Sequence, residues 1–399
     1  MQQATRTQSN FAIKWTITTY VSLTFIGFFI IGLCLSILPI FLTKELGYSK
    51  LVAGVVISLQ YISTLIFRSK AGQITDTQGP KPAILLSMQN FFISGIFLLL
   101  AYYFRDLALV SMVFIILMRL ITGKAEGMVG TTPINWAIMN VGEKHTATAI
   151  SLNGIASYGA LALGAPLGVV LVEYFSFYAI GIFILILSIL GYLLTLKKSN
   201  NLAIQNTKRE SFMKVFAKVA PYGLGLAAGG LGFGAISSFM TLYYDYYNWA
   251  NGALCMTLFG ALFIIGRFIF SNSINKYGGI KVSIACLLIE SLGLLMIFLS
   301  ATPILVLIGA GITGLGFSLV FPALGVVAMS TVAENNKGSA LAGYGVFIDI
   351  SLAVTGPIIG LVADHLGMPY IYLAAACLVF IGFVHTIILS KKEKIQHSI

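Results

Sequence analysis

Charged residues are scarce in this sequence, and their scarcity excludes a soluble globular protein. Only 9% of the 399 residues are Asp, Glu, Lys or Arg, whereas 58% are hydrophobic, and the mean hydropathy is +0.94. A soluble chain of this length needs far more polar surface to cover its core. The composition therefore predicts a polytopic membrane protein.

Cysteine and histidine are also rare, with four of each. The cysteines lie inside apolar runs without a CxxC pair, which predicts small buried residues and not disulfides or metal ligands. The histidines show no HExxH or other metal-ligand spacing. There is no GxxxxGK[ST] loop and no GxSxG elbow, and the GxGxxG formed by Gly309, Gly311 and Gly314 lies in an apolar span without a preceding strand. We therefore expect no enzymatic activity, no cofactor and no bound metal.

Long apolar runs are abundant. A spanning helix needs about 20 mostly apolar residues, and this rule predicts an all-α membrane protein with twelve transmembrane helices. The predicted spans are residues 14–42, 51–70, 82–104, 107–139, 146–172, 174–196, 219–247, 250–272, 280–300, 303–332, 338–363 and 369–390. The hydrophilic segment 197–218 is interpreted as a cytoplasmic linker between two six-helix halves, 1–196 and 219–399.

The basic residues are unevenly distributed between the two sides of the predicted bundle. With the N-terminus in the cytoplasm, nineteen of the 24 lysines and arginines fall in cytoplasmic loops and ends, and three fall outside. The other two, Arg119 and Lys124, lie within a span. This asymmetry fits the positive-inside rule and predicts that both termini are cytoplasmic. The net charge of +11 is therefore interpreted as a consequence of membrane topology, and we expect no nucleic-acid partner.

The two halves are also related in sequence. Arg68 is matched 199 residues later by Arg267, and further along an offset of 191 matches Gly154 with Gly345. Two six-helix halves in parallel orientation are typical of transporters, with the substrate site between the halves near the middle of the membrane.

Charge inside a lipid-embedded helix is expensive, so each charged residue in a span is a candidate functional residue. Arg119 and Glu126 are seven residues apart, which places them within about 20° of one helix face. The two side chains could sense protons together, or they could form a structural ion pair that braces the bundle.

Further polar residues lie on other spans. Glu290 is either held by a hydroxyl group of a neighbouring helix or takes part in transport. Asp349, which aligns with Tyr158 of the first half, is interpreted as binding cargo or a proton in preference to a purely structural role. The uncharged candidates for lining the cleft, each of which could instead only pack against a neighbouring helix, are Tyr158, Asn153, Tyr344, Gln60 and Tyr61.

The segment Gly72-Gln-Ile-Thr-Asp76-Thr-Gln-Gly79-Pro-Lys81 resembles the loop signature GxLaDrxGrk of the major facilitator superfamily. The resemblance implies that Asp76 and Lys81 form a cytoplasmic latch when the protein is closed on that side. Thr77 stands where the family usually has an arginine after the aspartate, so either Arg68 or Lys70 is expected to supply the missing charge.

Two further motifs support the same family. Arg119 followed by Gly123 resembles the superfamily's arginine motif on the fourth helix, which is associated with proton coupling. Four residues of the fifth span resemble the antiporter motif GxxxGPxxGG, namely Gly159, Gly164, Pro166 and Gly168. This resemblance implies export. The strings RLITGKAEG, NGIASYGALALGAPLG and FPALGV resemble bacterial permeases of the YhhS and YfcJ type.

These features together predict a secondary transporter of the bacterial inner membrane. The favoured function is proton-coupled efflux of a small organic molecule by a monomer that alternates access across the lipid bilayer. Proton-driven uptake uses the same residues and remains the alternative. A transport-inactive sensor or assembly partner is a further possibility, although such a protein would be expected to lose its buried charges.

Overall fold

The computed structural model describes residues 10–200, 211–270, 272–333 and 336–396. Within these ranges every regular element is helical. Eleven helical segments are long and apolar enough to cross a membrane, and the remaining predicted span, 250–272, corresponds to the shorter apolar helix α10 (Leu254–Phe270). The predicted all-helical membrane fold is thereby confirmed.

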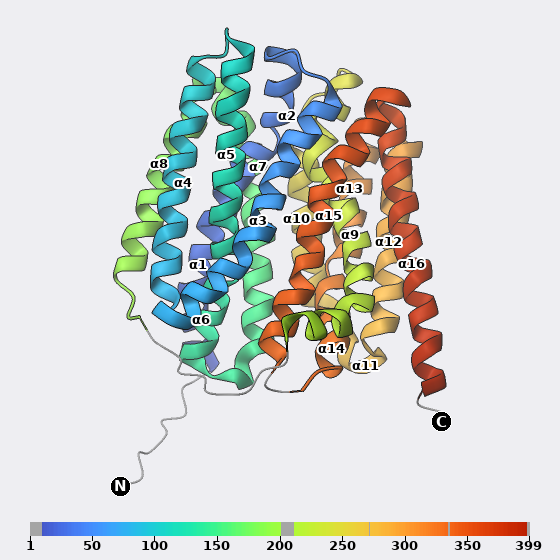
Figure 1. Cartoon of the computed structure of the whole chain (residues 1–399). Coiled ribbons are helices and arrows are strands. Elements are labelled where there is room, and N and C mark those ends of the chain that lie inside the picture. Colours follow the sequence, from blue (N-terminus) through green and yellow to red (C-terminus); the bar gives the residue numbers. More distant parts are fainter. Residues whose placement is uncertain (1–9, 201–210, 271, 334–335, 397–399) are drawn as a thin grey trace.

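The first half of the chain forms a bundle whose long helices cross its full height (Figure 1). Its elements are α1 (Asn10–Leu35), α2 (Leu38–Ile40), η1 (Phe41–Glu45), α3 (Lys50–Gln78), α4 (Pro80–Tyr103), α5 (Ala108–Val129), α6 (Thr132–Val141), η2 (Glu143–His145), α7 (Thr146–Phe175) and α8 (Tyr178–Leu196).

The second half forms a similar bundle beside the first. Its elements are α9 (Phe212–Tyr246), α10 (Leu254–Phe270), α11 (Ser273–Tyr277), α12 (Gly279–Leu299), α13 (Pro303–Phe317), α14 (Val320–Ser330), α15 (Lys337–His365), η4 (Met368–Tyr370) and α16 (Ile371–Gln396). Helix α9 begins at Phe212, inside the predicted linker 197–218. Its first turns lie across the end of the bundle where α1 begins and α16 ends (Figure 1).

The two halves meet along two seams, α3 with α15 and α7 with α10. We call the end where α1 begins and α16 ends the termini end, and the opposite end the far end. Along the first seam the backbones of Gly54 and Gly356 are in direct contact. A side-chain carbon on either glycine would collide with the carbonyl oxygen of the other. Small residues permit such close helix approach in membranes, where van der Waals packing drives association.

Two predicted spans, 107–139 and 303–332, are each broken into a pair of helices. The first becomes α5 and α6, and the second becomes α13 and α14. Each break is followed by a proline in the first turn of the next helix, Pro133 in α6 and Pro322 in α14. Proline lacks a backbone N–H and is tolerated at the start of a helix but not in its interior.

The loop boundaries differ from those predicted at two functionally important points. Helix α3 continues to Gln78 and ends at Gly79, whose φ of +92° suits glycine, so Arg68 lies ten residues inside the helix. Helix α10 extends to Phe270 and contains Arg267. Both arginines lie inside helices, as the predicted spans 51–70 and 250–272 imply, and their assignment to the cytoplasmic side stays a prediction.

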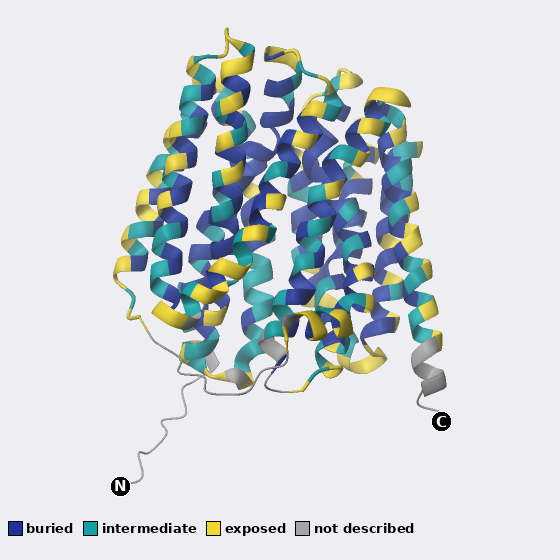
Figure 2. Cartoon of the chain, viewed as in Figure 1, coloured by how far each residue is buried: buried dark blue, intermediate teal, exposed yellow. Residues whose placement is uncertain are grey.

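Burial divides the bundle into a packed interior and an apolar outer surface (Figure 2). Large hydrophobic side chains are exposed along the outside of α8, including Ile182, Ile186 and Leu193. An exposed apolar face of this kind is expected where a helix contacts lipid acyl chains.

Candidate functional site

Glu126 lies in the interior of the first half, between α5 and α3. Its Oε2 accepts a hydrogen bond from Gln60 Nε2 (2.8 Å) and one from Thr64 Oγ1 (3.0 Å). Arg119 is also buried, and its Nη2 donates to the carbonyl oxygen of Ile57 (2.7 Å). The structure shows no ion pair between Arg119 and Glu126, so the carboxylate is held by neutral donors from α3.

Arg68 and Asp349 join the two halves by an ion pair with one hydrogen bond, from Arg68 Nη2 to Asp349 Oδ1. Arg68 Nη2 lies 2.8 Å from Asp349 Oδ1, and Arg68 Nε lies 2.7 Å from Oδ2. Only 17% of the arginine side chain and 3% of the aspartate side chain are exposed. A charge-assisted hydrogen bond is stronger than a neutral one, so this pair fixes α3 against α15 well inside the bundle.

Helix α3 aligns these two sites on one face. Gln60, Thr64 and Arg68 are spaced by four residues, which places them one above another along a helix. The face therefore carries polar groups from Glu126 in the first half to Asp349 in the second.

Glu290 occupies a different position, on α12 in the second half. It is fully buried, and among the described residues neither of its carboxylate oxygens has a hydrogen-bond partner. The carboxyl group packs against the glycine face of α9: a side-chain carbon at Gly232 would lie 2.5 Å from Oε1, and one at Gly229 would lie 3.0 Å from Oε2. A hydroxyl group from a neighbouring helix was one of the two alternatives for Glu290, and the described part of the chain supplies none.

Two of the five uncharged cleft candidates, Asn153 and Tyr158, lie on α7 and have different partners. Asn153 accepts a hydrogen bond from Thr24 of α1 at 2.9 Å. The ring of Tyr158 packs against aromatic rings of the second half, with its centroid 4.0 Å from that of Phe263. Residues 151–156 of α7 are all partly exposed, although α7 packs between α1 and α10. This stretch of α7 is therefore not fully covered by its two neighbours.

The loop motif is described only in part. Gly72 lies on α3, Gly79 forms the turn into α4, and the side chain of Asp76 lies outside the described part of the structure. Lys81 Nζ donates to the carbonyl oxygens of Leu196 (2.7 Å) and Lys198 (2.8 Å). Lys81 thus stabilises the end of α8 within its own half, and the predicted latch stays a prediction.

Lys198 lies just beyond α8 and is partly buried. Partial burial lowers the pKa of Lys198, because removal from water disfavours its charged form. Its Nζ donates to Thr19 Oγ1 (3.1 Å) and lies 3.9 Å from the centroid of the Tyr20 ring.

The antiporter-like motif lies on the side of α7 that packs against α1. Side-chain carbons at Gly164 and Gly168 would press on the backbone of Gly32 and Leu33, respectively. Pro166 lies inside the same helix, whereas Gly159 faces Ile264 of α10 at an ordinary contact distance. The motif therefore brings α1 and α7 into close contact.

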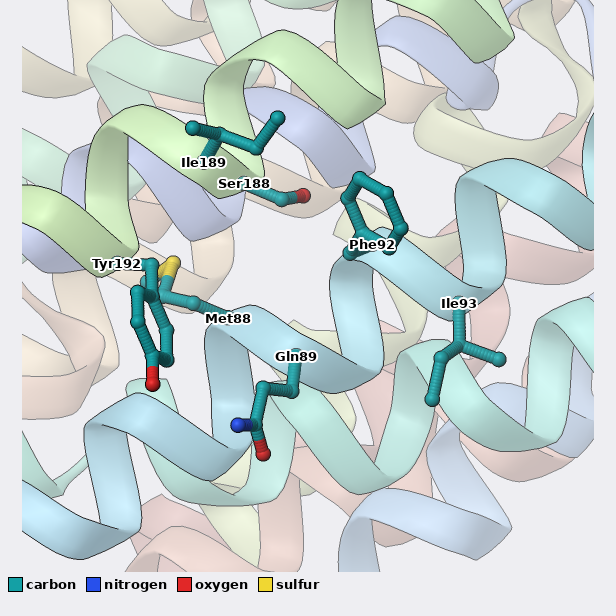
Figure 3. A pocket seen from close by; sticks show the side chains of 7 residues that line it. All are labelled: Met88, Gln89, Phe92, Ile93, Ser188, Ile189 and Tyr192. Atoms are coloured by element: carbon teal, nitrogen blue, oxygen red, sulfur yellow. The ribbon is translucent and has the colours of Figure 1, made fainter.

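A groove of about 410 Å³ lies on the outside of the bundle between α4 and α8 (Figure 3). It is lined by Met88, Gln89, Phe92, Ile93, Ser188, Ile189 and Tyr192. None of these side chains is charged, and none of the buried charged residues described above contributes to its wall. The groove is therefore a feature of the outer face and not part of the charged centre.

The sequence of the chain matches a family model. The description of that model is Major Facilitator Superfamily, and residues 20–272 and 251–398 match it. The chain belongs to the major facilitator superfamily. It is 43% identical over 386 residues to an uncharacterized MFS-type transporter of Burkholderia pseudomallei (strain 1106a), with 97% of this chain and 95% of that protein covered.

A second relative and a solved structure agree with this assignment. An uncharacterized MFS-type transporter of Pseudomonas aeruginosa (strain LESB58) is 46% identical over 366 residues, with 92% of this chain and 90% of that protein covered. The crystal structure of a D-xylose–proton symporter superposes with a TM-score of 0.76 at 14% identity and covers 95% of this chain and 97% of its own. The family is therefore shared with the two MFS-type relatives, and the fold with the solved symporter.

Sequence reasoning missed one buried charge. Arg267 is 6% exposed and lies between α7, α10 and α13, although the sequence places it next to polar residues that resemble a loop. The match between Arg68 and Arg267 at an offset of 199 is the sequence signal for this burial, because Arg68 occupies on α3 the position that Arg267 occupies on α10.

Proposed function

We propose that this chain is a proton-coupled exporter that moves a small organic molecule by alternating access of its two halves. The observation that carries the proposal is the buried Arg68–Asp349 pair, which connects the halves through a group that can bind a proton. Protonation of Asp349 would remove the negative member of the pair and release α3 from α15.

The polar face of α3 supports coupling between the two carboxylates. Glu126 is held by Gln60 and Thr64, and Arg68 follows one turn later on the same face. A proton that binds Glu126 alters the hydrogen bonds on α3, and the same helix carries the residue that holds Asp349. Coupling through one rigid element that has two packing arrangements is a recognised physical route between sites.

Opening and closing at opposite ends is supported by the distribution of contacts between the halves. The hydrogen bonds and the ion pair between α3 and the second half run from Lys50 at the far end to Arg68. Among the described side chains of α3, none beyond Arg68 makes such a contact. Together with the partly exposed residues of α7, this pattern fits a bundle closed at the far end and open towards the termini end. With cytoplasmic termini, that arrangement would face the interior of a bacterial cell.

Export is favoured over uptake by the glycine and proline pattern of α7, which resembles that of antiporters. Proton-driven uptake is the second candidate, since the same carboxylates serve either direction. The solved D-xylose–proton symporter has the same fold, which permits symport as well.

Transport by inverted membrane vesicles tests the direction. Candidate cargoes come from a deletion strain screened for lost tolerance to toxins and metabolites, with complementation by the intact gene. We expect accumulation of such a cargo when the vesicle lumen is acidic, and loss of that accumulation in Asp349→Asn. Accumulation that needs the opposite gradient would establish uptake, and gradient-independent movement would contradict proton coupling.

A further inference from the structure

Arg267 in the second half corresponds to Arg68 in the first half, and each arginine reaches across a seam to the other half. Arg68 lies against α15, where a side-chain carbon at Gly345 would be 3.2 Å from its Nη1. Arg267 lies against α7, where a side-chain carbon at Gly154 would collide with its Nη1. Gly345 and Gly154 are themselves matched by the offset of 191, so the two contacts are copies of one another.

The two copies differ in the residue that follows each glycine by four positions. In the first copy this residue is Asp349, which neutralises Arg68. In the second copy it is Tyr158, whose ring packs on Phe263, and Arg267 stacks over the same Phe263 ring at 4.7 Å. A phenol carries no charge at neutral pH, so the second seam has the cation of the first without its anion.

Arg267 has no acidic partner among the described residues. Its Nε donates to the carbonyl oxygen of Ser318 at 3.0 Å, and the residue is 6% exposed. A buried cation without a counter-ion is costly, and arginine presents a planar fork suited to a carboxylate or a phosphate. Because the described residues supply no anion, the charge of Arg267 is available to an anionic group that arrives along the partly exposed residues 151–156 of α7, which include its contact Gly154.

The surroundings of Arg267 are aromatic where those of Arg68 are polar. The offsets of 199 and 191 match Gln60, Thr64 and Glu126 with three aromatic residues of the second half, namely Phe259, Phe263 and Phe317. These rings lie 6.0 to 6.4 Å apart, and Phe233 of α9 stacks on Phe317 at 5.9 Å. Tyr158 covers the cluster and is its partly exposed member.

We infer that Arg267 and Tyr158 form the binding site for the cargo, and that the cargo is an organic anion with an aromatic or planar apolar body. The anionic group binds the guanidinium of Arg267, and the apolar body stacks on the exposed face of Tyr158. This inference rests on the proposed transport function, since it names the substrate class that the transporter carries.

Ligand binding by the purified full-length chain in detergent, measured by the shift of its thermal unfolding midpoint, tests the inference without a proton gradient. The probes are benzoate, its neutral analogue benzamide and its cationic analogue benzylamine, at one ionic strength set with sodium chloride. We expect benzoate to raise the midpoint in a saturable way, and benzamide and benzylamine to leave it unchanged.

Two variants of the site and one control decide the role of the arginine. Arg267→Gln is expected to weaken benzoate binding by roughly ten- to a hundredfold, the usual loss for a charge-assisted hydrogen bond. Arg267→Lys, which retains the charge but not the planar fork, is expected to bind with an affinity between those of Arg267→Gln and the unmodified chain. Arg105→Gln removes an exposed arginine from the loop between α4 and α5 and is expected to bind as the unmodified chain does.

Equal shifts with benzoate and benzamide, no shift with benzoate, or an unchanged benzoate shift in Arg267→Gln would each overturn the inference. Its failure is distinguishable from failure of the transport proposal. Binding that depends on Arg267 without gradient-driven movement would contradict transport alone, and gradient-driven movement of cargoes that do not need Arg267 would contradict the anion site alone.

Discussion

Lys44 of the first half and Asp245 of the second form an ion pair of 2.5 Å at the far end of the bundle. Close by, Asp364 at the end of α15 accepts hydrogen bonds from the backbone N–H groups of Lys50 (3.3 Å) and Leu51 (2.9 Å), which begin α3. A carboxylate at a helix N-terminus satisfies N–H groups that have no partner within the helix. These contacts join the two halves at the far end.

Replacement of Asp364 by Ala is expected to loosen the first turn of α3. The loss of a side-chain acceptor at a helix N-terminus costs about 1 kcal/mol, so amide hydrogen exchange at residues 50–53 should accelerate roughly fivefold. Hydrogen–deuterium exchange with mass spectrometry measures this rate. Asp106→Ala, in an exposed loop of the first half, is the matched control and should leave it unchanged. Equal acceleration in both variants would show that Asp364 does not stabilise the turn.

The Arg68–Asp349 pair is expected to show strong energetic coupling. Arg68→Gln or Asp349→Asn alone leaves one charged member buried without its partner, which costs about 3 to 5 kcal/mol for buried pairs. The double variant should lose much less stability than the two single losses combined. Chemical denaturation of the detergent-solubilised protein measures the three values. Additive losses would mean that the two side chains do not stabilise each other.

Replacement of Glu126 by Gln is expected to uncouple movement of the cargo from the proton gradient. The amide keeps the shape of the carboxyl group but cannot bind and release a proton. Gradient-driven accumulation in vesicles should fall by about 5- to 150-fold, the range of ordinary coupling free energies. Glu173→Gln, an exposed carboxylate near the end of α7, should retain it. An unaltered pH dependence in Glu126→Gln would remove Glu126 from the proton pathway.

Glu290 and Glu126 are expected to respond in opposite ways to an apolar replacement. Glu290 has no hydrogen-bond partner in the described part of the chain, so Glu290→Met removes an unsatisfied polar group and should raise the unfolding free energy by about 1 to 3 kcal/mol. Glu126→Met deprives Gln60 and Thr64 of their acceptor and should lower it by a similar amount. Thermal and chemical unfolding of the detergent-solubilised protein measure the unfolding free energies of Glu290→Met and Glu126→Met. A loss of stability in Glu290→Met would indicate that its carboxyl group is satisfied in the folded protein.

Much of the fold follows from hydropathy, because a lipid environment leaves helices of about 20 apolar residues as the ordinary way to cross. That rule predicted the spans, including the long run that Pro133 divides into α5 and α6. It ended the second span at residue 70, whereas α3 continues to Gln78, since a window of charged residues looks the same in a loop as in the last turns of a helix. Helix continuity there depends on the first breaker, which for α3 is Gly79.

The candidate site was predicted less completely than the fold. The sequence indicated Asp349 and Glu126 as intramembrane carboxylates, because Asp349 stands alone in an apolar run and Glu126 lies within a predicted span. It could not reveal that Asp349 meets Arg68, since that contact joins residues 281 positions apart on different halves. Likewise, the helical spacing of Arg119 and Glu126 suggested a direct pairing, whereas Glu126 takes its partners from α3.

The matched positions in the two halves have practical meaning for protein engineering. One half presents Gln60, Thr64 and Glu126 where the other presents Phe259, Phe263 and Phe317, so duplication was followed by specialisation of each copy. The proposed proton groups, Glu126 and Asp349, are divided between the halves, and so are the proposed cargo groups, Tyr158 and Arg267. A chimera that keeps the first half and takes its second from a relative should therefore exchange one part of each site, and neither site should remain as it was.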